Sequence, residues 1–108
     1  MSDKIEILNH LKRNLQKVLG NKIQKVILFG SWIRNEENEY SDIDVLIVSD
    51  KILSWREKNL IRDVCFDLSV DYEILVDSKI ISQEEIENKF WGKHPLITDA
   101  LEKGVYAE

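Results

Sequence analysis

Two short apolar runs separated by a polar stretch constrain the fold of this chain more than any other feature. The first run, Val26 to Phe29, ends at Gly30-Ser31, and the second, Val45 to Val48, follows Asp42-Ile43-Asp44. Short runs of β-branched and aliphatic residues are typical of strands that are covered on both faces. The pattern therefore predicts two core strands on either side of a polar turn.

The expected strands and their surroundings define the fold class. The two core strands are predicted over residues 23–29 and 42–48, and a third over Ser69 to Val76, where apolar and polar side chains alternate. A short helix is predicted over residues 31–36. At 108 residues the chain has the length of one domain, expected to span residues 1–108. The prediction is an α/β (α+β) fold with a small mixed sheet of three to four strands packed with helices.

Helices are predicted before, between and after the strands. Apolar residues at steps of three and four predict an amphipathic helix over residues 3–19. The pair Ser54 and Glu57 has capping-box spacing and predicts the start of a second helix, and Ser82 with Glu85 repeats that spacing. A final helix is expected to begin near Pro95. The buried face of the second helix is predicted to comprise Leu60, Ile61, Val64, Cys65 and Leu68.

Composition excludes several classes of protein. With 15 basic and 20 acidic residues the net charge is −5, which argues against general binding to a nucleic-acid backbone. A single cysteine, Cys65, excludes an intrachain disulfide and is expected to be a buried core residue. The first residues do not resemble a signal segment, and no stretch approaches the roughly 20 apolar residues of a membrane span. A cytoplasmic protein without a membrane partner is expected.

Residues at the two strand ends indicate chemistry. Asp42 and Asp44 are two apart, so on a strand their carboxylates leave the same face and repel unless a cation lies between them. Mg²⁺ commonly binds such carboxylates together with phosphate oxygens. The small Gly30-Ser31 step would let a phosphate approach backbone amides and a hydroxyl. Taken singly, each pattern is also explained by strand caps or by a turn glycine followed by a capping serine.

The combination Gly30-Ser31, ten residues, then Asp42-Ile43-Asp44 resembles the signature of polymerase-β-like nucleotidyltransferases, and is closest to their minimal nucleotidyltransferase (MNT) branch. The resemblance covers about residues 5–106 and implies that family's fold. It also implies a third carboxylate on a later strand, for which Asp71 is the matching residue and Glu73 the alternative.

The resemblance has departures and neighbouring candidates. Trp32-Ile33 and Asn35 stand where small residues and a glycine are common in the family turn. Arg34 within the turn is expected either to neutralise triphosphate charge or to be a solvated arginine. His94 is a candidate for substrate contact, with a satisfied or exposed histidine as its alternative.

The implied chemistry is nucleotidyl transfer assisted by two Mg²⁺ ions. Asp42 and Asp44 would hold the ions, and Asp71 would bind the ion nearest the acceptor hydroxyl and help to deprotonate it. Gly30 and Ser31 would hold the phosphates of ATP, the expected substrate.

The resemblance also implies a protein partner. MNT proteins of this kind resemble the antitoxins of two-gene modules whose toxin is an all-helical HEPN ribonuclease, and they transfer AMP to a tyrosine of that toxin. A hetero-oligomer with the toxin is expected, with a homodimer of the chain alone as a further arrangement. Two alternatives remain: a non-catalytic module that masks its partner by contact, and a transferase that acts on a small molecule.

Overall fold

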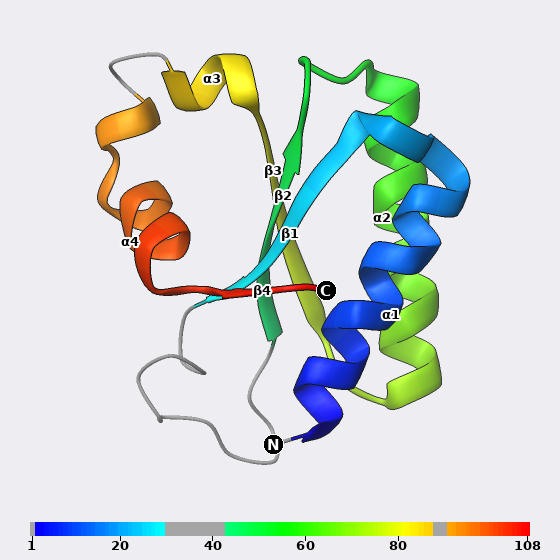
Figure 1. Cartoon of the computed structure of the whole chain (residues 1–108). Coiled ribbons are helices and arrows are strands. Elements are labelled where there is room, and N and C mark those ends of the chain that lie inside the picture. The colour runs from blue at the N-terminus through cyan, green and yellow to red at the C-terminus, as the bar shows by residue number, and fades with distance from the viewer. Residues whose placement is uncertain (1, 30–42, 88–90) are drawn as a thin grey trace.

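A four-stranded sheet lies between two layers of helices in the computed structural model of the chain, which describes residues 2–29, 43–87 and 91–108 (Figure 1). Helices α1 (Ser2–Leu19) and α2 (Trp55–Tyr72) lie on one side of the sheet, and α3 (Gln83–Glu87) and α4 (Pro95–Lys103) lie on the other. This arrangement confirms the predicted α/β class with a small, helix-packed sheet.

The sheet is mixed, with the order β3-β2-β1-β4. Strand β1 (Ile23–Phe29) pairs antiparallel with β2 (Ile43–Ser49) and with the short β4 (Val105–Tyr106), whereas β2 pairs parallel with β3 (Val76–Ser82). The first two strands confirm the sequence prediction to within one residue at each end. Strand β4 was not predicted, because two residues carry too little periodicity to indicate a strand.

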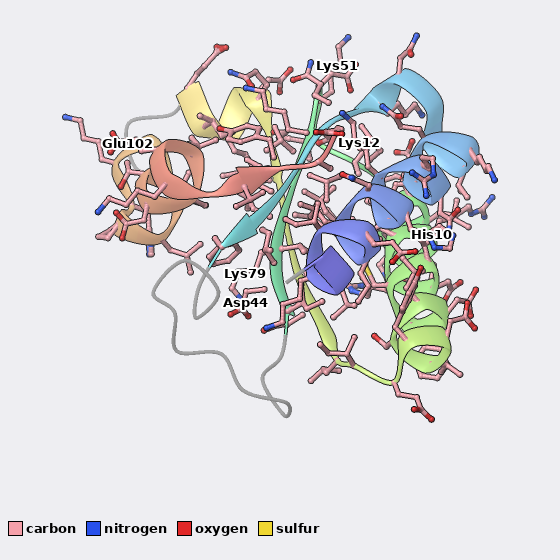
Figure 2. All side chains as sticks on the ribbon, turned by 60° about the horizontal axis from the view of Figure 1, so that its bottom comes forward. His10, Lys12, Asp44, Lys51, Lys79 and Glu102 are labelled. Atoms are coloured by element: carbon pink, nitrogen blue, oxygen red, sulfur yellow. The ribbon has the colours of Figure 1, made fainter. Side chains whose placement is uncertain are left out.

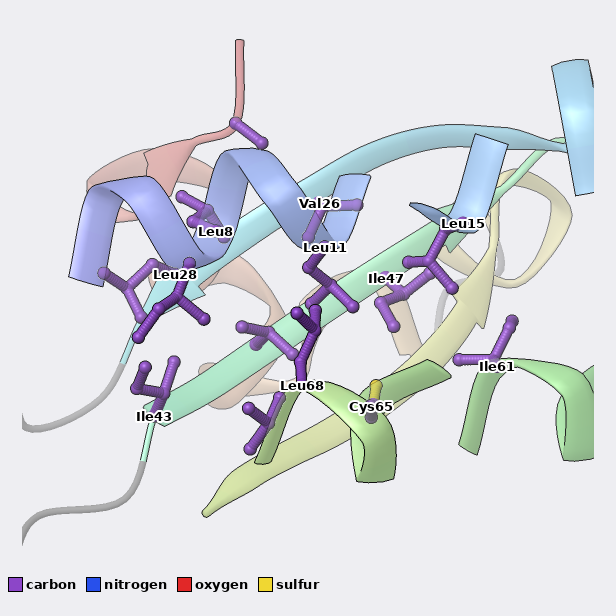
Figure 3. Close-up of a cluster of buried hydrophobic side chains, with 14 of the residues drawn as sticks. Leu8, Leu11, Leu15, Val26, Leu28, Ile43, Ile47, Ile61, Cys65 and Leu68 are labelled. Atoms are coloured by element: carbon purple, nitrogen blue, oxygen red, sulfur yellow. The ribbon is translucent and has the colours of Figure 1, made fainter. Parts of the chain in front are cut away.

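One face of the sheet, here called the α1/α2 face, carries the larger part of the core. Leu8, Leu11 and Leu15 of α1 point onto the sheet, and α2 adds a second row of side chains beside them (Figure 3). The buried side chains that the sheet and α2 contribute to this cluster are Ile23, Val26, Leu28, Ile43, Val45, Ile47, Val76, Ile61, Cys65 and Leu68. Each buried side chain of this size contributes about 1.5–3 kcal/mol relative to an exposed one.

The opposite face, here called the α4 face, has a smaller apolar cluster. Ile97 and Ala100 of α4 pack with alternate residues of the three long strands, which are Ile27, Phe29, Leu46, Val48 and Ile81. Gly104 ends α4, and a side chain there would collide with the Ile27 side chain and the Ala100 carbonyl. Close approach of the backbone to β1 therefore explains the glycine and leads the chain into β4.

Helix ends follow the signals in the sequence. The Ser54 hydroxyl accepts from the Glu57 amide at 3.2 Å, and the Glu57 carboxylate accepts from the Ser54 amide at 2.9 Å. The predicted capping box of α2 is thus confirmed, as is the second box, in which Ser82 and Glu85 make the same two bonds, both at 3.1 Å. Pro95 begins α4, as predicted.

The predicted strand from Ser69 to Val76 is wrong. Helix α2 continues to Tyr72, Glu73 follows it in the left-handed conformation at φ 55°, and β3 begins only at Val76. The apolar stripe of α2 extends one further turn, and the Tyr72 hydroxyl lies 3.0 Å from Nδ1 of His10 on α1. This tertiary contact helps to hold the last turn helical, although its alternating sequence suits a strand.

Two smaller predictions also have an outcome. Leu60, predicted on the buried face of α2, is 38% exposed, whereas Ile61, Cys65 and Leu68 are buried as expected. The helix predicted over residues 31–36 lies outside the described residues. Among the described helices, none is both long and apolar enough to cross a membrane.

Candidate active site

Two carboxylates lie side by side where β2 and β3 begin. Asp44 is the second residue of β2 and Asp77 the second residue of β3, and the two are paired directly across the parallel strands. On the other side of Asp44, its antiparallel partner is Phe29, the last residue of β1. Asp77, Asp44 and Phe29 therefore form one row across three strands, with adjacent strands about 4.8 Å apart.

The row lies on the α4 face. Side chains alternate along a strand, so Asp44 shares the face of Leu46 and Val48, and Asp77 shares the face of Ile81. Those three apolar residues belong to the cluster that packs with α4. Asp44 is half-buried and Asp77 is exposed, so the apolar cover of this face gives way to charge at the starts of β2 and β3.

The donor set of this row suits a hard cation. Carboxylate oxygens on adjacent strands point the same way, and two such charges repel unless a positive group lies between them. Mg²⁺ binds one or two protein carboxylates together with phosphate oxygens. The residues present therefore fit Mg²⁺. Within the described part of the chain, no group of three or more histidine, cysteine, aspartate and glutamate side chains is arranged to hold a metal ion.

Four of the predicted site residues lie outside the described residues. They belong to the segment 30–42, which starts directly after Phe29 and ends directly before Ile43, and they are Gly30, Ser31, Arg34 and Asp42. The chain therefore leaves and re-enters the described sheet at neighbouring strands, next to the row that contains Asp44. The roles predicted for these four residues remain predictions.

The structure does not bring Asp71 or Glu73 into this row. Asp71 is exposed in the last turn of α2, in the layer that covers the α1/α2 face, whereas Asp44 lies on the α4 face. Glu73 is the exposed C-cap of the same helix. Their predicted position on a strand beside Asp44 is wrong because the strand itself begins later, at Val76.

Asp77 was missed by the sequence reasoning. The signal that could have identified it is a second Val-Asp pair, Val76-Asp77, which comes shortly before the apolar Ile80-Ile81 and the capping box at Ser82. The capping box at Ser82 marks the start of a helix, so a strand that leads directly into this helix must end at about Ser82. Counting back from Ser82 places Asp77, and not Asp71, on the strand.

His94 and Cys65 each make a local structural contact. Nδ1 of His94 accepts from the Leu96 amide at 3.2 Å, so this exposed histidine caps the start of α4. Burial raises the pKa of the Cys65 thiol, an effect that a hydrogen bond with Ser78 partly offsets. Cys65 is thus a core residue, as predicted.

Solved structures share this fold. One, described as "a putative nucleotidyltransferase from Sulfolobus solfataricus", superposes with a TM-score of 0.62 at 17% identity, covering 96% of this chain and 78% of that one. A second, described as a toxin-antitoxin with AMP-PNP, gives a TM-score of 0.55 at 15% identity over 91% of this chain and 70% of that one. At such low identities the likeness shows the fold alone.

Sequence comparison shows the family. A Methanocaldococcus jannaschii protein named "putative protein adenylyltransferase" is 37% identical over 86 residues, which are 80% of this chain and 86% of that protein. Residues 6–106 match the family model described as the nucleotidyltransferase domain. Since that match spans nearly the whole chain, the protein is a nucleotidyltransferase and belongs to the nucleotidyltransferase domain family.

Proposed function

We propose that this protein transfers AMP from ATP to a tyrosine hydroxyl of a partner HEPN-type toxin and thereby acts as its antitoxin. The observation that carries the proposal is the direct pairing of Asp44 with Asp77 on the α4 face. The 37% identical relative named as a protein adenylyltransferase supports protein as the acceptor. The structural neighbour described as a toxin-antitoxin with AMP-PNP supports a toxin partner and a nucleotide substrate.

In this proposal Asp42, Asp44 and Asp77 form the set of three carboxylates. Asp77 takes the role that the family resemblance implied for Asp71, because Asp77 lies beside Asp44 on the sheet and Asp71 lies on α2. Bound there, two Mg²⁺ ions would neutralise phosphate charge and orient the attacking and leaving oxygens.

The residues divide the reaction between them. The tyrosine oxygen forms a bond to the α-phosphorus of ATP, the bond from that phosphorus to the pyrophosphate oxygen breaks, and pyrophosphate leaves. Asp77, the exposed member of the row, accepts the proton of the tyrosine hydroxyl as general base. Its exposure lets the hydroxyl of another protein reach it.

The turn after β1 would hold the triphosphate. Gly30 and Ser31 directly follow Phe29, which is paired with Asp44, so their chain position is next to the carboxylates. Backbone amides and the Ser31 hydroxyl would donate to phosphate oxygens, and Arg34 would neutralise part of their charge.

The partner supplies the acceptor. We infer a hetero-oligomer of this chain, acting as a single domain over residues 1–108, with the toxin. The proposed location of the pair is the cytoplasm, where ATP and Mg²⁺ are both available.

The test uses ATP labelled at either the α- or the γ-phosphate, with Mg²⁺, the purified chain and the product of the adjacent gene. Label should pass to a tyrosine of the partner from α-labelled ATP and not from γ-labelled ATP. Asp44→Asn should abolish the transfer, whereas Asp63→Asn, which removes the same charge from an exposed position of α2, should not. Neutralised toxicity without any labelling would contradict the proposal and favour masking by contact.

A further inference from the structure

Lys79 is the only cationic residue of β2 and β3, the two strands that carry the carboxylate pair. It lies two residues after Asp77 and therefore on the same α4 face, and its partner across the sheet is Leu46, two residues after Asp44. Figure 2 shows the Lys79 and Asp44 side chains next to one another at the lower end of the sheet. The rows Asp77–Asp44 and Lys79–Leu46 are thus adjacent.

Distance permits a shared ligand. Two residues along a strand advance by about 6.6 Å, and a lysine side chain has a flexible stem of four carbons. An ammonium group on that stem can extend along the face to meet a phosphate group bound at the carboxylate row. It enters the site from the β3 edge, on the side of β2 opposite to β1.

The Lys79 ammonium group is available for such a ligand. Lys79 is exposed, and it makes no hydrogen bond or ion pair within the described parts of the chain. Other lysines are already engaged: Lys22 pairs with Glu57, and the ammonium of Lys25 lies 5.9 Å from the centre of the Tyr106 ring. A cation that stays unpaired although two carboxylates are near can accept an anionic group without breaking an existing bond.

Charge gives the reason for a cation at this position. The chain carries a net charge of −5, and the row itself adds two carboxylates to the place where a polyanionic nucleotide must bind. The negative carboxylates of the row repel the negative phosphate groups of the nucleotide. An ammonium group at the edge of the row offsets part of that repulsion and offers a hydrogen bond that is strengthened by charge.

We propose that Lys79 is a positioning residue that binds a non-bridging phosphate oxygen of the nucleotide from the β3 edge of the site. The proposal rests on the proposed function, because it assigns a contact to the nucleotide of that same site. It requires no covalent step and leaves proton transfer to Asp77. Loss of the cation should weaken nucleotide binding and raise the KM for ATP more than it lowers kcat.

The experiment measures binding of α,β-methylene ATP, whose α–β linkage resists transfer, by calorimetry with Mg²⁺ and without acceptor. Lys79→Met should weaken binding about tenfold or more, the effect of losing one charged hydrogen bond. Lys79→Arg should restore binding to within about threefold, because it restores the cation. Lys51→Met is the matched control, since Lys51 is exposed at the opposite end of the sheet (Figure 2).

Each outcome of the binding experiment supports or contradicts the role assigned to Lys79. Wild-type affinity in Lys79→Met, or equal weakening in Lys79→Met and Lys51→Met, would overturn the assignment while leaving the proposed function intact. No binding of the analogue by the wild-type chain would instead contradict the proposed function itself. Lys79→Gln, which keeps a polar side chain of similar length, provides a second test of the charge, and its melting temperature verifies that the fold is unchanged.

Discussion

The two faces of the sheet differ in what covers them. The α1/α2 face carries the larger apolar cluster of the long strands, and two 18-residue helices lie across it. The α4 face is apolar where the nine-residue α4 packs, and it changes to Asp44, Asp77 and Lys79 toward the starts of β2 and β3. On this face the apolar residues pack against α4, and the charged residues form the candidate active site.

This difference separates stability from function within the same strands. Val45 and Ile47 contribute to the larger core, while their neighbour Asp44, on the opposite side of β2, is paired with a second carboxylate. Two like charges on adjacent strands oppose folding, and such an arrangement persists where function requires it. Substitutions on the two faces should therefore affect different measurements.

The largest expected effect separates two aspartates that are only six residues apart. Asp77→Asn should reduce the rate of AMP transfer by about 10²–10⁴-fold, the usual contribution of a general base. Asp71→Asn should leave the rate within about twofold, because Asp71 is exposed on α2, behind the other face of the sheet. Initial rates with the partner protein and α-labelled ATP measure both.

Asp77→Asn and Asp71→Asn make the same chemical change, and their melting temperatures test whether either variant loses activity through unfolding. Asp77→Asn should melt at or slightly above the wild-type temperature, since it relieves repulsion with Asp44. A reversed result, in which Asp71→Asn is inactive and Asp77→Asn is active, would contradict the assignment of the carboxylate row to β2 and β3.

Much of the fold follows from local patterns in the sequence, and the misassigned third strand shows where those patterns fail. The runs that became β1 and β2, the two capping boxes and the proline of α4 are each determined by residues close in sequence. The segment from Ser69 to Val76 alternates in the same way as a strand. Its final turn of helix depends on a partner far along the chain, because Tyr72 contacts His10 on α1.

The junction between α2 and β3 explains why the third carboxylate was misplaced. The Ser69 hydroxyl donates to the Cys65 carbonyl at 2.9 Å and accepts from the Val76 amide at 3.0 Å, so it joins the helix directly to the start of β3. No periodicity in the sequence indicates a bond of this kind, since Val76 lies seven positions after Ser69. Asp44 was predictable because it follows a strand boundary, whereas Asp77 required this junction to be known.

The next effect concerns the α1/α2 face. Leu11 of α1 is fully buried in the larger core, and Leu11→Ala should lower the free energy of unfolding by about 2–5 kcal/mol. The transfer rate per folded molecule should change little, because Leu11 lies on the face opposite to the carboxylate row. Urea denaturation and rates corrected for the folded fraction measure the two quantities separately.

An effect of Leu11→Ala on the transfer rate would show that the two faces of the sheet are coupled. If Leu11→Ala lowered the rate of the folded fraction as strongly as Asp77→Asn does, packing under α1 would control the positions of the carboxylates. The separation between a stabilising and a reactive face would then be wrong.

The smallest expected effect lies at the edge of the α1/α2 face, where α2 begins. The Glu57 carboxylate pairs with the Lys22 ammonium and accepts from Ser54, and these contacts lower its pKa from the ordinary 4.5 to about 2. A pKa that is lower in the folded than in the unfolded state adds stability above pH 4.5, and this stability is lost as the pH falls toward 2.

Glu57→Gln keeps an oxygen that can accept from the Ser54 amide and removes only the charge. The difference in unfolding free energy between wild type and Glu57→Gln should thus be constant from pH 7 to about 5 and shrink below pH 4.5, as urea unfolding at several pH values would measure. Lys22 is exposed and Glu57 is only half-buried, so solvent ions reach the pair and 1 M salt should also reduce the difference. A difference that persists unchanged below pH 3, or in high salt, would show that Glu57 stabilises α2 through its hydrogen bonds and not through its charge.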